Sequence, residues 1–155
     1  MNPQQPQYGS PPPPAAPNRW GPTSLGMEAH IAAGLSYIWI VGLIFFFVEK
    51  TNRFVRFHAA QSILLGIASA ILWIALTIVD SIIIGAASVS NSAGAAAAGL
   101  GVATVLGCVG FLVGLAIFGM FLWGLIAGFM GKYVKFPIIG NIAERWAGGP
   151  AMMTP

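Results

Sequence analysis

Three long apolar runs dominate the chain, and polar segments separate them. The runs cover residues 30–48, 58–84 and 102–130. At a helical rise of about 1.5 Å per residue, each run can cross a hydrocarbon core about 30 Å thick. Neither of the two longer runs is long enough for two spans. The pattern therefore predicts an all-α fold class, an integral membrane helical bundle with three transmembrane helices.

The remaining segments are polar or built of small residues. Residues 1–27 are rich in Pro, Gln, Gly and Ser, so they bury too little surface to fold and predict a disordered tail. An alternative role for its SPPPPAAP stretch is binding to a Pro-recognition domain. Residues 85–101 predict a flexible connection that is partly helical in its alanines, and residues 147–155 predict a short flexible tail. The membrane domain is thus expected over residues 28–146.

A short amphipathic helix is expected after the last run, over about residues 137–147. Pro137 suits the first turn of a helix. The apolar residues that then share one face are Ile138, Ile139, Ile142, Ala143 and Trp146. Such a helix is typical of a segment that lies on the membrane surface.

Composition agrees with a membrane protein. Of the 155 residues, 57% are hydrophobic and only 7% are charged, and the mean hydropathy is +0.81. A soluble domain usually has about a quarter charged residues. Cys108 stands alone inside an apolar run, so no disulfide or cysteine metal site is expected within one chain. The first residues lack the basic and apolar regions of a signal peptide.

Basic residues predict the orientation in the membrane. They gather in the first loop and after the last run, as Lys50, Arg53, Arg56, Lys132, Lys135 and Arg145. The positive-inside rule places both segments in the cytoplasm. With three spans, the Pro-rich tail is then expected outside a plasma membrane.

The stretch EKTNRFVRFHAAQS, residues 49–62, concentrates charge between two apolar runs. Its Phe and Arg residues predict a turn on the membrane surface that contacts anionic headgroups or a protein partner. The candidate interaction or lipid-contact residues are Glu49, Asn52, Arg53, Arg56, His58 and Gln61.

Polar residues form a stripe along the second run. Its candidate members within the membrane are Ser62, Ser69, Thr77 and Asp80. Asp80 is the one acid within any of the runs. Helix packing through hydrogen bonds is the favoured interpretation, and a polar path or substrate cavity is the alternative.

Small residues form a face along the third run. The candidates for close helix packing are Gly107, Gly110, Gly114, Gly124 and Gly128. Glycine lets two helix backbones approach closely. The partner is either the second run or another copy of the chain.

Two motifs resemble a known family. EKTNRFVRFHAAQSILLG and GKYVKFPIIGNIAERW are similar to segments of a small bacterial multispanning membrane family of unknown function. That family is related to the chloroplast inner-envelope protein-import component (Tic-twenty-like). The resemblance covers roughly residues 28–146 and implies a membrane protein. The plant relative takes part in protein import, but the bacterial members have no settled activity, so the resemblance does not carry import over to this chain. It implies no catalytic residue.

No enzymatic activity is expected. Only His30 and His58 are available as general bases, and no nucleophile motif or metal-ligand spacing accompanies them. No cofactor or nucleic acid is expected. The predicted function is that of a non-enzymatic membrane interaction or protein-translocation-associated subunit. Its partners would be anionic headgroups and either another membrane protein or a second copy of the chain. The alternative is a small transporter or channel that uses the polar stripe.

Overall fold

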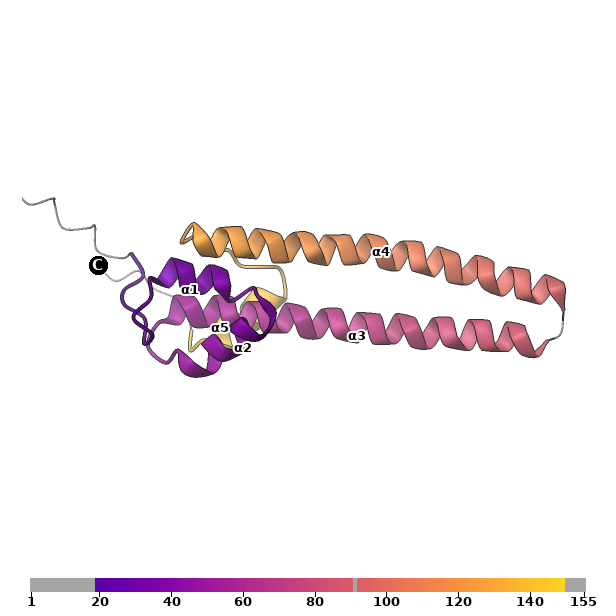
Figure 1. The fold of residues 1–155 in the computed structure, drawn as a ribbon, viewed down its shortest axis with the longest axis horizontal. Coiled ribbons are helices and arrows are strands. Elements are labelled where there is room, and N and C mark those ends of the chain that lie inside the picture. The colour runs from indigo at the N-terminus through magenta and orange to yellow at the C-terminus, as the bar shows by residue number, and fades with distance from the viewer. Residues whose placement is uncertain (1–18, 91, 150–155) are drawn as a thin grey trace, which may run out of the picture.

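Two antiparallel helices form the body of the protein (Figure 1). The computed structural model describes residues 19–90 and 92–149. Helix α3 runs over Arg53–Val89 and helix α4 over Ala93–Phe129, each with 37 residues. At about 1.5 Å per residue, each is about 56 Å long, well beyond the thickness of a hydrocarbon core. Among the described residues, these two helices are long and apolar enough to cross a membrane.

Local sequence signals set the ends of these helices. The side chains of Asn52 and Ser92 cap α3 and α4 by accepting from the amides of Val55 and Ala95. Gly131, with φ +64°, ends α4 in a Schellman-type turn. The connection expected over 85–101 is much shorter than predicted. Its alanines are helical, as expected, and they extend both helices on either side of residues 90–92.

The expected first span is two short helices instead of one. Helix α1 covers Ala29–Leu35 and helix α2 covers Trp39–Val48. Between them the chain reverses, so the hydrogen bonds from Ser24 to Glu49 join the two ends of this α1–α2 hairpin (residues 29–48). The prediction of a single membrane-crossing helix over 30–48 is therefore wrong. At about 15 Å, α2 is long enough for only half of a hydrocarbon core.

Helix α5, Ile139–Trp146, packs against the start of α3. Its buried residues Gly140 and Ala143 face inward, and Ala143 and Ala147 pack with Phe57 and Ala60 of α3. The helix begins two residues after Pro137, because Ile138 forms a γ-turn with φ 67° and ψ −62° that bonds the amide of Ile139 to Pro137 O. The predicted apolar face is therefore split between the protein and the surroundings: Ala143 is buried, whereas Ile138, Ile142 and Trp146 are exposed.

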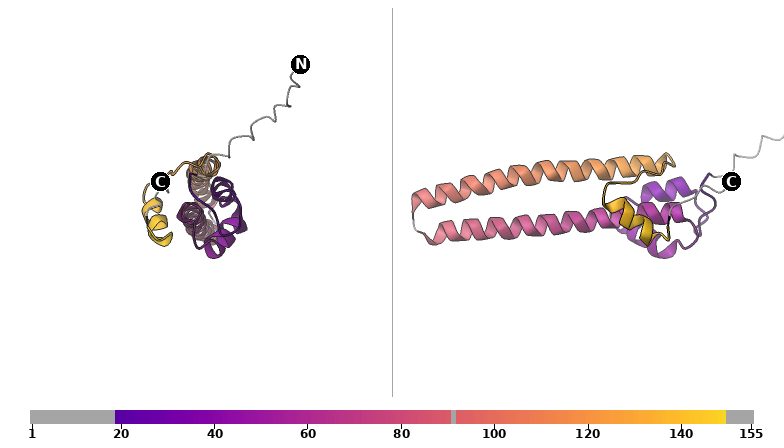
Figure 2. Two further views of the ribbon diagram at one scale, coloured as in Figure 1. Left: turned by 90° about the vertical axis from the view of Figure 1, so that its left-hand side faces the viewer. Right: turned by 180° about the vertical axis from the view of Figure 1, so that it is seen from behind.

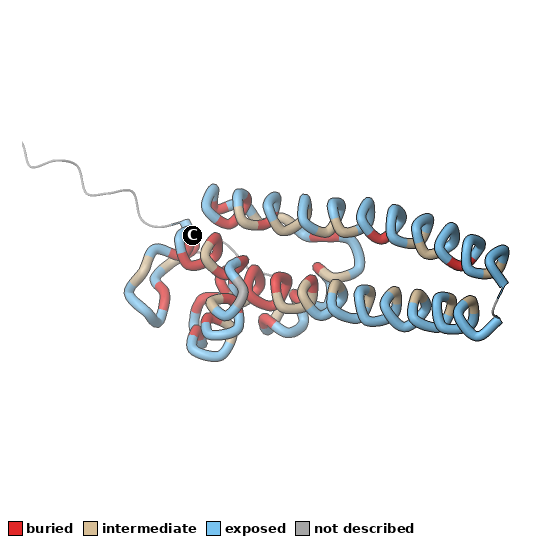
Figure 3. The backbone as a smooth tube through the Cα atoms, turned by 45° about the vertical axis from the view of Figure 1, so that its right-hand side comes forward, coloured by how far each residue is buried: buried red, intermediate tan, exposed pale blue. Residues whose placement is uncertain are grey.

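Buried residues gather at one end of the molecule (Figure 3). We call this end the platform: residues 20–65 and 127–147, which comprise α1, α2, α5 and the adjoining ends of α3 and α4. Figure 2 shows the short helices grouped around the two long ones at that end. Beyond the platform, α3 and α4 expose apolar side chains along most of their length, as helices in lipid do.

The platform also includes part of the expected disordered tail. Trp20 is only 8% exposed, and its ring stacks on Phe54 with centroids 4.2 Å apart. Residues 20–27 therefore belong to the folded part of the chain. The rest of that tail, residues 1–18, and residues 150–155 of the C-terminal tail lie outside the described residues.

Candidate functional site

The stretch over residues 49–62 lies at the centre of the platform, at the start of α3. Segments from distant parts of the sequence converge on it: residues 20–24, the turn at Tyr37 and residues 131–136. The cap at Asn52 fixes the first turn of α3, so every side chain that follows has a defined direction. The stretch is thus a junction that holds the platform together.

Glu49 closes the α1–α2 hairpin. Its carboxylate accepts hydrogen bonds from the amide (2.8 Å) and hydroxyl (2.7 Å) of Ser24. It also accepts from the amide and hydroxyl of Thr51 and from the amide of Asn52, at 2.8–2.9 Å. Burial alone would raise the pKa of Glu49, but the hydrogen bonds outweigh it and lower the pKa to about 2. Glu49 is therefore a buried, ionised anchor.

Asn52 fixes the segment before α1. Its side-chain amide donates to the carbonyl oxygens of Trp20, Gly21 and Pro22, at 2.9–3.3 Å. Trp20 in turn donates from its ring nitrogen to the carbonyl of Gly131, at 2.8 Å. The segment before α1 is thus tied to the start of α3 and to the end of α4.

His58, Tyr37 and Gln61 form a buried network. A carbonyl only accepts, so with a neutral ring Nε2 of His58 donates to Lys132 O (3.2 Å) and Nδ1 accepts from the Tyr37 hydroxyl (3.3 Å). Gln61 donates to Tyr37 at 2.9 Å and to Val134 O at 3.1 Å, and it accepts from the amide of Phe136 at 3.2 Å. Both nitrogens of His58 are therefore occupied by structural partners.

The structure corrects the assignment of four candidate interaction residues. Glu49, Asn52, His58 and Gln61 are at most 4% exposed, so they do not contact lipid. Their polar groups are satisfied within the protein, as buried polar groups must be. Sequence reasoning missed their partners Ser24, Trp20 and Lys132, which lie far away in sequence. One sequence signal for this network was Tyr37. It lies inside an apolar run and away from its edges, which indicates that its hydroxyl contacts another part of the protein.

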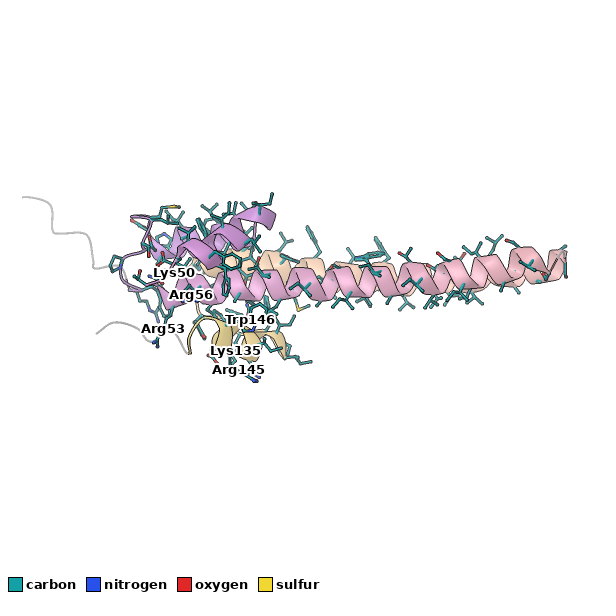
Figure 4. All side chains as sticks on the ribbon, turned by 90° about the horizontal axis from the view of Figure 1, so that it is seen from below. Lys50, Arg53, Arg56, Lys135, Arg145 and Trp146 are labelled. Atoms are coloured by element: carbon teal, nitrogen blue, oxygen red, sulfur yellow. The ribbon has the colours of Figure 1, made fainter. Side chains whose placement is uncertain are left out.

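The basic residues lie on the outside of the platform (Figure 4). Lys50 and Arg53 are exposed, whereas Arg56 is half-buried, with Nη2 3.4 Å from Trp146 O and its guanidinium 5.6 Å from the Phe46 ring centre. All seven Lys and Arg residues of the chain lie at this end, and none lies between residues 57 and 131. The platform is therefore the one strongly basic end of the molecule.

An acidic residue of α5 pairs with one of these bases. Glu144 pairs with Lys135 at 2.7 Å and accepts from the hydroxyl of Tyr133 at 2.7 Å. These hydrogen bonds from Lys135 and Tyr133 lower the pKa of Glu144. The pair fixes α5 against the segment that precedes it.

The polar stripe on α3 does not form one continuous lining. Ser62 is buried beside Gly42 of α2, and Thr77 bonds to Trp73 O of its own helix. Ser62 and Ser69 line an apolar groove of about 620 Å³ between α2, α3 and α4. Asp80 lies on the α4-facing side between Leu76 and Ile83, with a buried Oδ1 that has no partner among the described residues.

The glycine face of α4 packs within the chain at four of its five positions. Gly110 and Gly114 face Leu76 and Trp73 of α3, Gly124 faces Tyr37, and Gly128 faces the backbone of α1. Gly107 has open space around it, so its assignment to the packing face is wrong. Nearer the tip of the helix pair, Gly99 packs against Ala87 of α3. Of the two expected partners, the second run, now α3, accounts for the contacts of Gly110 and Gly114. The α1–α2 hairpin, which was not expected, accounts for those of Gly124 and Gly128.

The described residues contain no cluster of three or more His, Cys, Asp or Glu side chains that could hold a metal ion.

Two long apolar helices joined to a polar junction define an all-helical integral membrane protein.

The chain is similar to archaeal membrane proteins. The UPF0132 membrane protein MJ1443 of Methanocaldococcus jannaschii is 32% identical over 129 residues, which cover 82% of this chain and 96% of that protein. A second protein of that organism, MJ1527, is 31% identical over 79% of this chain and 73% of its own length. A UPF0132 membrane protein of Archaeoglobus fulgidus is 28% identical over 79% of this chain and 99% of its own length. The chain belongs to the UPF0132 family of membrane proteins.

No family model and no solved structure matches the chain. The expected membrane class is thus confirmed, whereas the expected bacterial origin of the family is not supported by these archaeal relatives. Their descriptions say nothing of protein import.

Proposed function

We propose that this chain is a non-enzymatic membrane subunit that holds a rigid basic platform against the cytoplasmic face of the plasma membrane, where a second membrane protein docks. One observation carries the proposal: all seven Lys and Arg residues lie at the platform end, on a backbone fixed by buried hydrogen bonds. Each such base near an anionic membrane surface contributes about 1 kcal/mol of attraction. The platform therefore combines a fixed shape with a strong charge bias.

The resemblance of residues 49–66 to relatives of the chloroplast import component supports a translocation-associated partner. A second copy of the chain is the alternative partner. A transport role finds less support, since the members of the α3 stripe face different surroundings.

With α3 and α4 as the two membrane crossings, both ends of the α1–α2 hairpin are expected on the same side as the C-terminal segment. Single cysteines at Leu25, Thr51 and Ser92 in a Cys108→Ser background test this orientation. With an impermeant thiol reagent on intact cells, only Ser92→Cys should react, and all three should react after permeabilisation. Labelling at Thr51 in intact cells would mean that the true orientation is the opposite of the proposed one. Labelling at Leu25 with protection at Thr51 would show that the hairpin crosses the membrane.

The role of the exposed bases is tested with a fluorescent probe at Thr51→Cys in proteoliposomes. Phosphatidylglycerol should shift the probe emission relative to phosphatidylcholine, because Lys50 and Arg53 are exposed to headgroups. The double change Lys50→Gln and Arg53→Gln should remove most of the shift, whereas Arg53→Lys should keep it. An unchanged shift in the double variant contradicts the proposal, as does solute flux through the purified chain.

A further inference from the structure

We propose that the platform binds one anionic phospholipid, with its phosphate at Arg56 and one acyl chain in the groove below. This inference rests on the proposed function, because it assumes that the platform lies at an anionic membrane face. It goes further by assigning the lipid to a defined site between α2, α3 and α5.

Arg56 differs from the other bases because the fold holds it in place. Its guanidinium lies beside the Phe46 ring of α2 and near the carbonyl oxygen of Trp146 at the end of α5. The rings of Phe46 and Trp146 are themselves 6.1 Å apart, so aromatic side chains of both helices lie close to this guanidinium. A planar guanidinium with few conformations left is well suited to bind phosphate through two hydrogen bonds.

The surroundings of Arg56 suit the boundary between headgroups and acyl chains. Phe47 is 61% exposed and Trp146 is 44% exposed, and both aromatic residues neighbour the Phe46 ring. Trp and Phe at such a position favour the membrane interface. The three acidic residues at this end have partners of their own: Glu49 bonds inside the hairpin, Glu144 pairs with Lys135, and Oε2 of Glu28 lies 3.3 Å from Nε2 of His30. Arg145 on α5 adds a second exposed positive charge.

The apolar groove lies at the depth of an acyl chain. Its walls are Ile40 and Leu43 of α2 on one side and Ile63, Ile67 and Ala70 of α3 on the other. At about 1.5 Å per residue, these α3 positions lie about 10–21 Å along the helix from Arg56, and half of a hydrocarbon core is about 15 Å thick. They also follow Arg56 on nearly the same side of α3. Gly66 lies in the groove with open space around it, which leaves room for a chain.

The experiment measures binding of phosphatidylglycerol to the purified, delipidated full chain by native mass spectrometry in detergent. Arg56→Gln should weaken binding at least about tenfold, since a charge-assisted hydrogen bond is lost. Gly66→Leu should fill the groove and weaken binding about tenfold without touching Arg56. Gly107→Leu, at an open glycine outside the groove, should change the affinity less than about threefold. Arg53→Gln, at an exposed base that the fold does not hold in place, should weaken binding clearly less than Arg56→Gln does.

Several outcomes would overturn the site. Equal losses in Arg53→Gln and Arg56→Gln would indicate diffuse charge attraction, which contradicts the site and leaves the proposed function in place. Unchanged binding in Gly66→Leu would show that the acyl chain does not lie in the groove. Competition by glycerol phosphate as strong as that by the lipid would mean a free phosphate site. Arg56→Lys, which keeps the charge without the planar fork, should bind more weakly than wild type; equal binding contradicts recognition by the guanidinium.

Discussion

Gly128→Ala is expected to destabilise the protein by about 2–3 kcal/mol by forcing α1 away from α4. A Cβ at this position would lie 2.7 Å from the backbone nitrogen of Gly34 and 2.8 Å from the carbonyl carbon of Ala33. Backbone atoms of a packed helix cannot move aside as a flexible side chain can, so the helices must separate. Thermal unfolding in detergent measures the loss, and hydrogen exchange of the α1 amides locates it.

Gly119→Ala is the matched control. It lies on the same helix, and no atom approaches within 4 Å of a Cβ built there. Because alanine favours a helix over glycine by up to about 1 kcal/mol, this variant should be as stable as wild type or more stable. Equal destabilisation by both changes would show that α1 does not dock on α4.

The two long helices and α5 could be predicted from sequence because their signals are local. The apolar runs over 58–84 and 102–130 and the apolar positions of residues 137–147 are such local signals. The caps at Asn52 and Ser92 set helix ends that lie beyond the predicted runs. The glycine face of α4 was also readable, since glycines spaced along one face predict close packing. Its partner was not, because Gly124 and Gly128 meet the α1–α2 hairpin rather than a straight span.

The α1–α2 hairpin could not be predicted because the same apolar run suits either a span or a turn. No proline or charge interrupts residues 36–38. The turn is stabilised by contacts that are distant in sequence: Tyr37 bonds to His58 and Gln61, and Glu49 bonds to Ser24. Hydropathy depends only on the composition and length of a run. It contains no information about hydrogen-bond partners on another helix.

The same limitation explains the misplaced site residues. Residues 49–62 are dense in charged and aromatic side chains, and this density correctly indicated an unusual segment. It also led to the prediction that the segment lies on the membrane surface. Its polar side chains instead bind backbone groups of residues 20–22 and 132–136, which no spacing within the motif reveals. A buried polar group is satisfied by partners that the fold brings together, so its role emerges only with the fold.

Glu49→Gln is expected to destabilise the protein by about 3 kcal/mol at neutral pH and by almost nothing near pH 2. The carboxyl has a pKa of about 2 in the folded protein against 4.5 for the free group. Since the folded pKa is the lower one, the ionised form stabilises the fold above pH 4.5, and this stabilisation is lost as the pH falls towards 2. Glutamine keeps the shape, but its NH₂ group faces the donors of Ser24 and Thr51.

Thermal unfolding of both proteins between pH 7 and pH 2 measures the difference. The two stability curves should lie far apart at pH 7 and converge at acid pH, because Glu144 and the other titrating groups are common to both proteins and cancel. Glu28→Gln, which changes a carboxylate side chain that is 64% exposed, should leave the wild-type curve in place. Parallel curves for wild type and Glu49→Gln would mean that the charge of Glu49 does not hold the hairpin ends together. The closure between Ser24 and Glu49 would then depend on shape alone, and the α1–α2 hairpin would lose its electrostatic anchor.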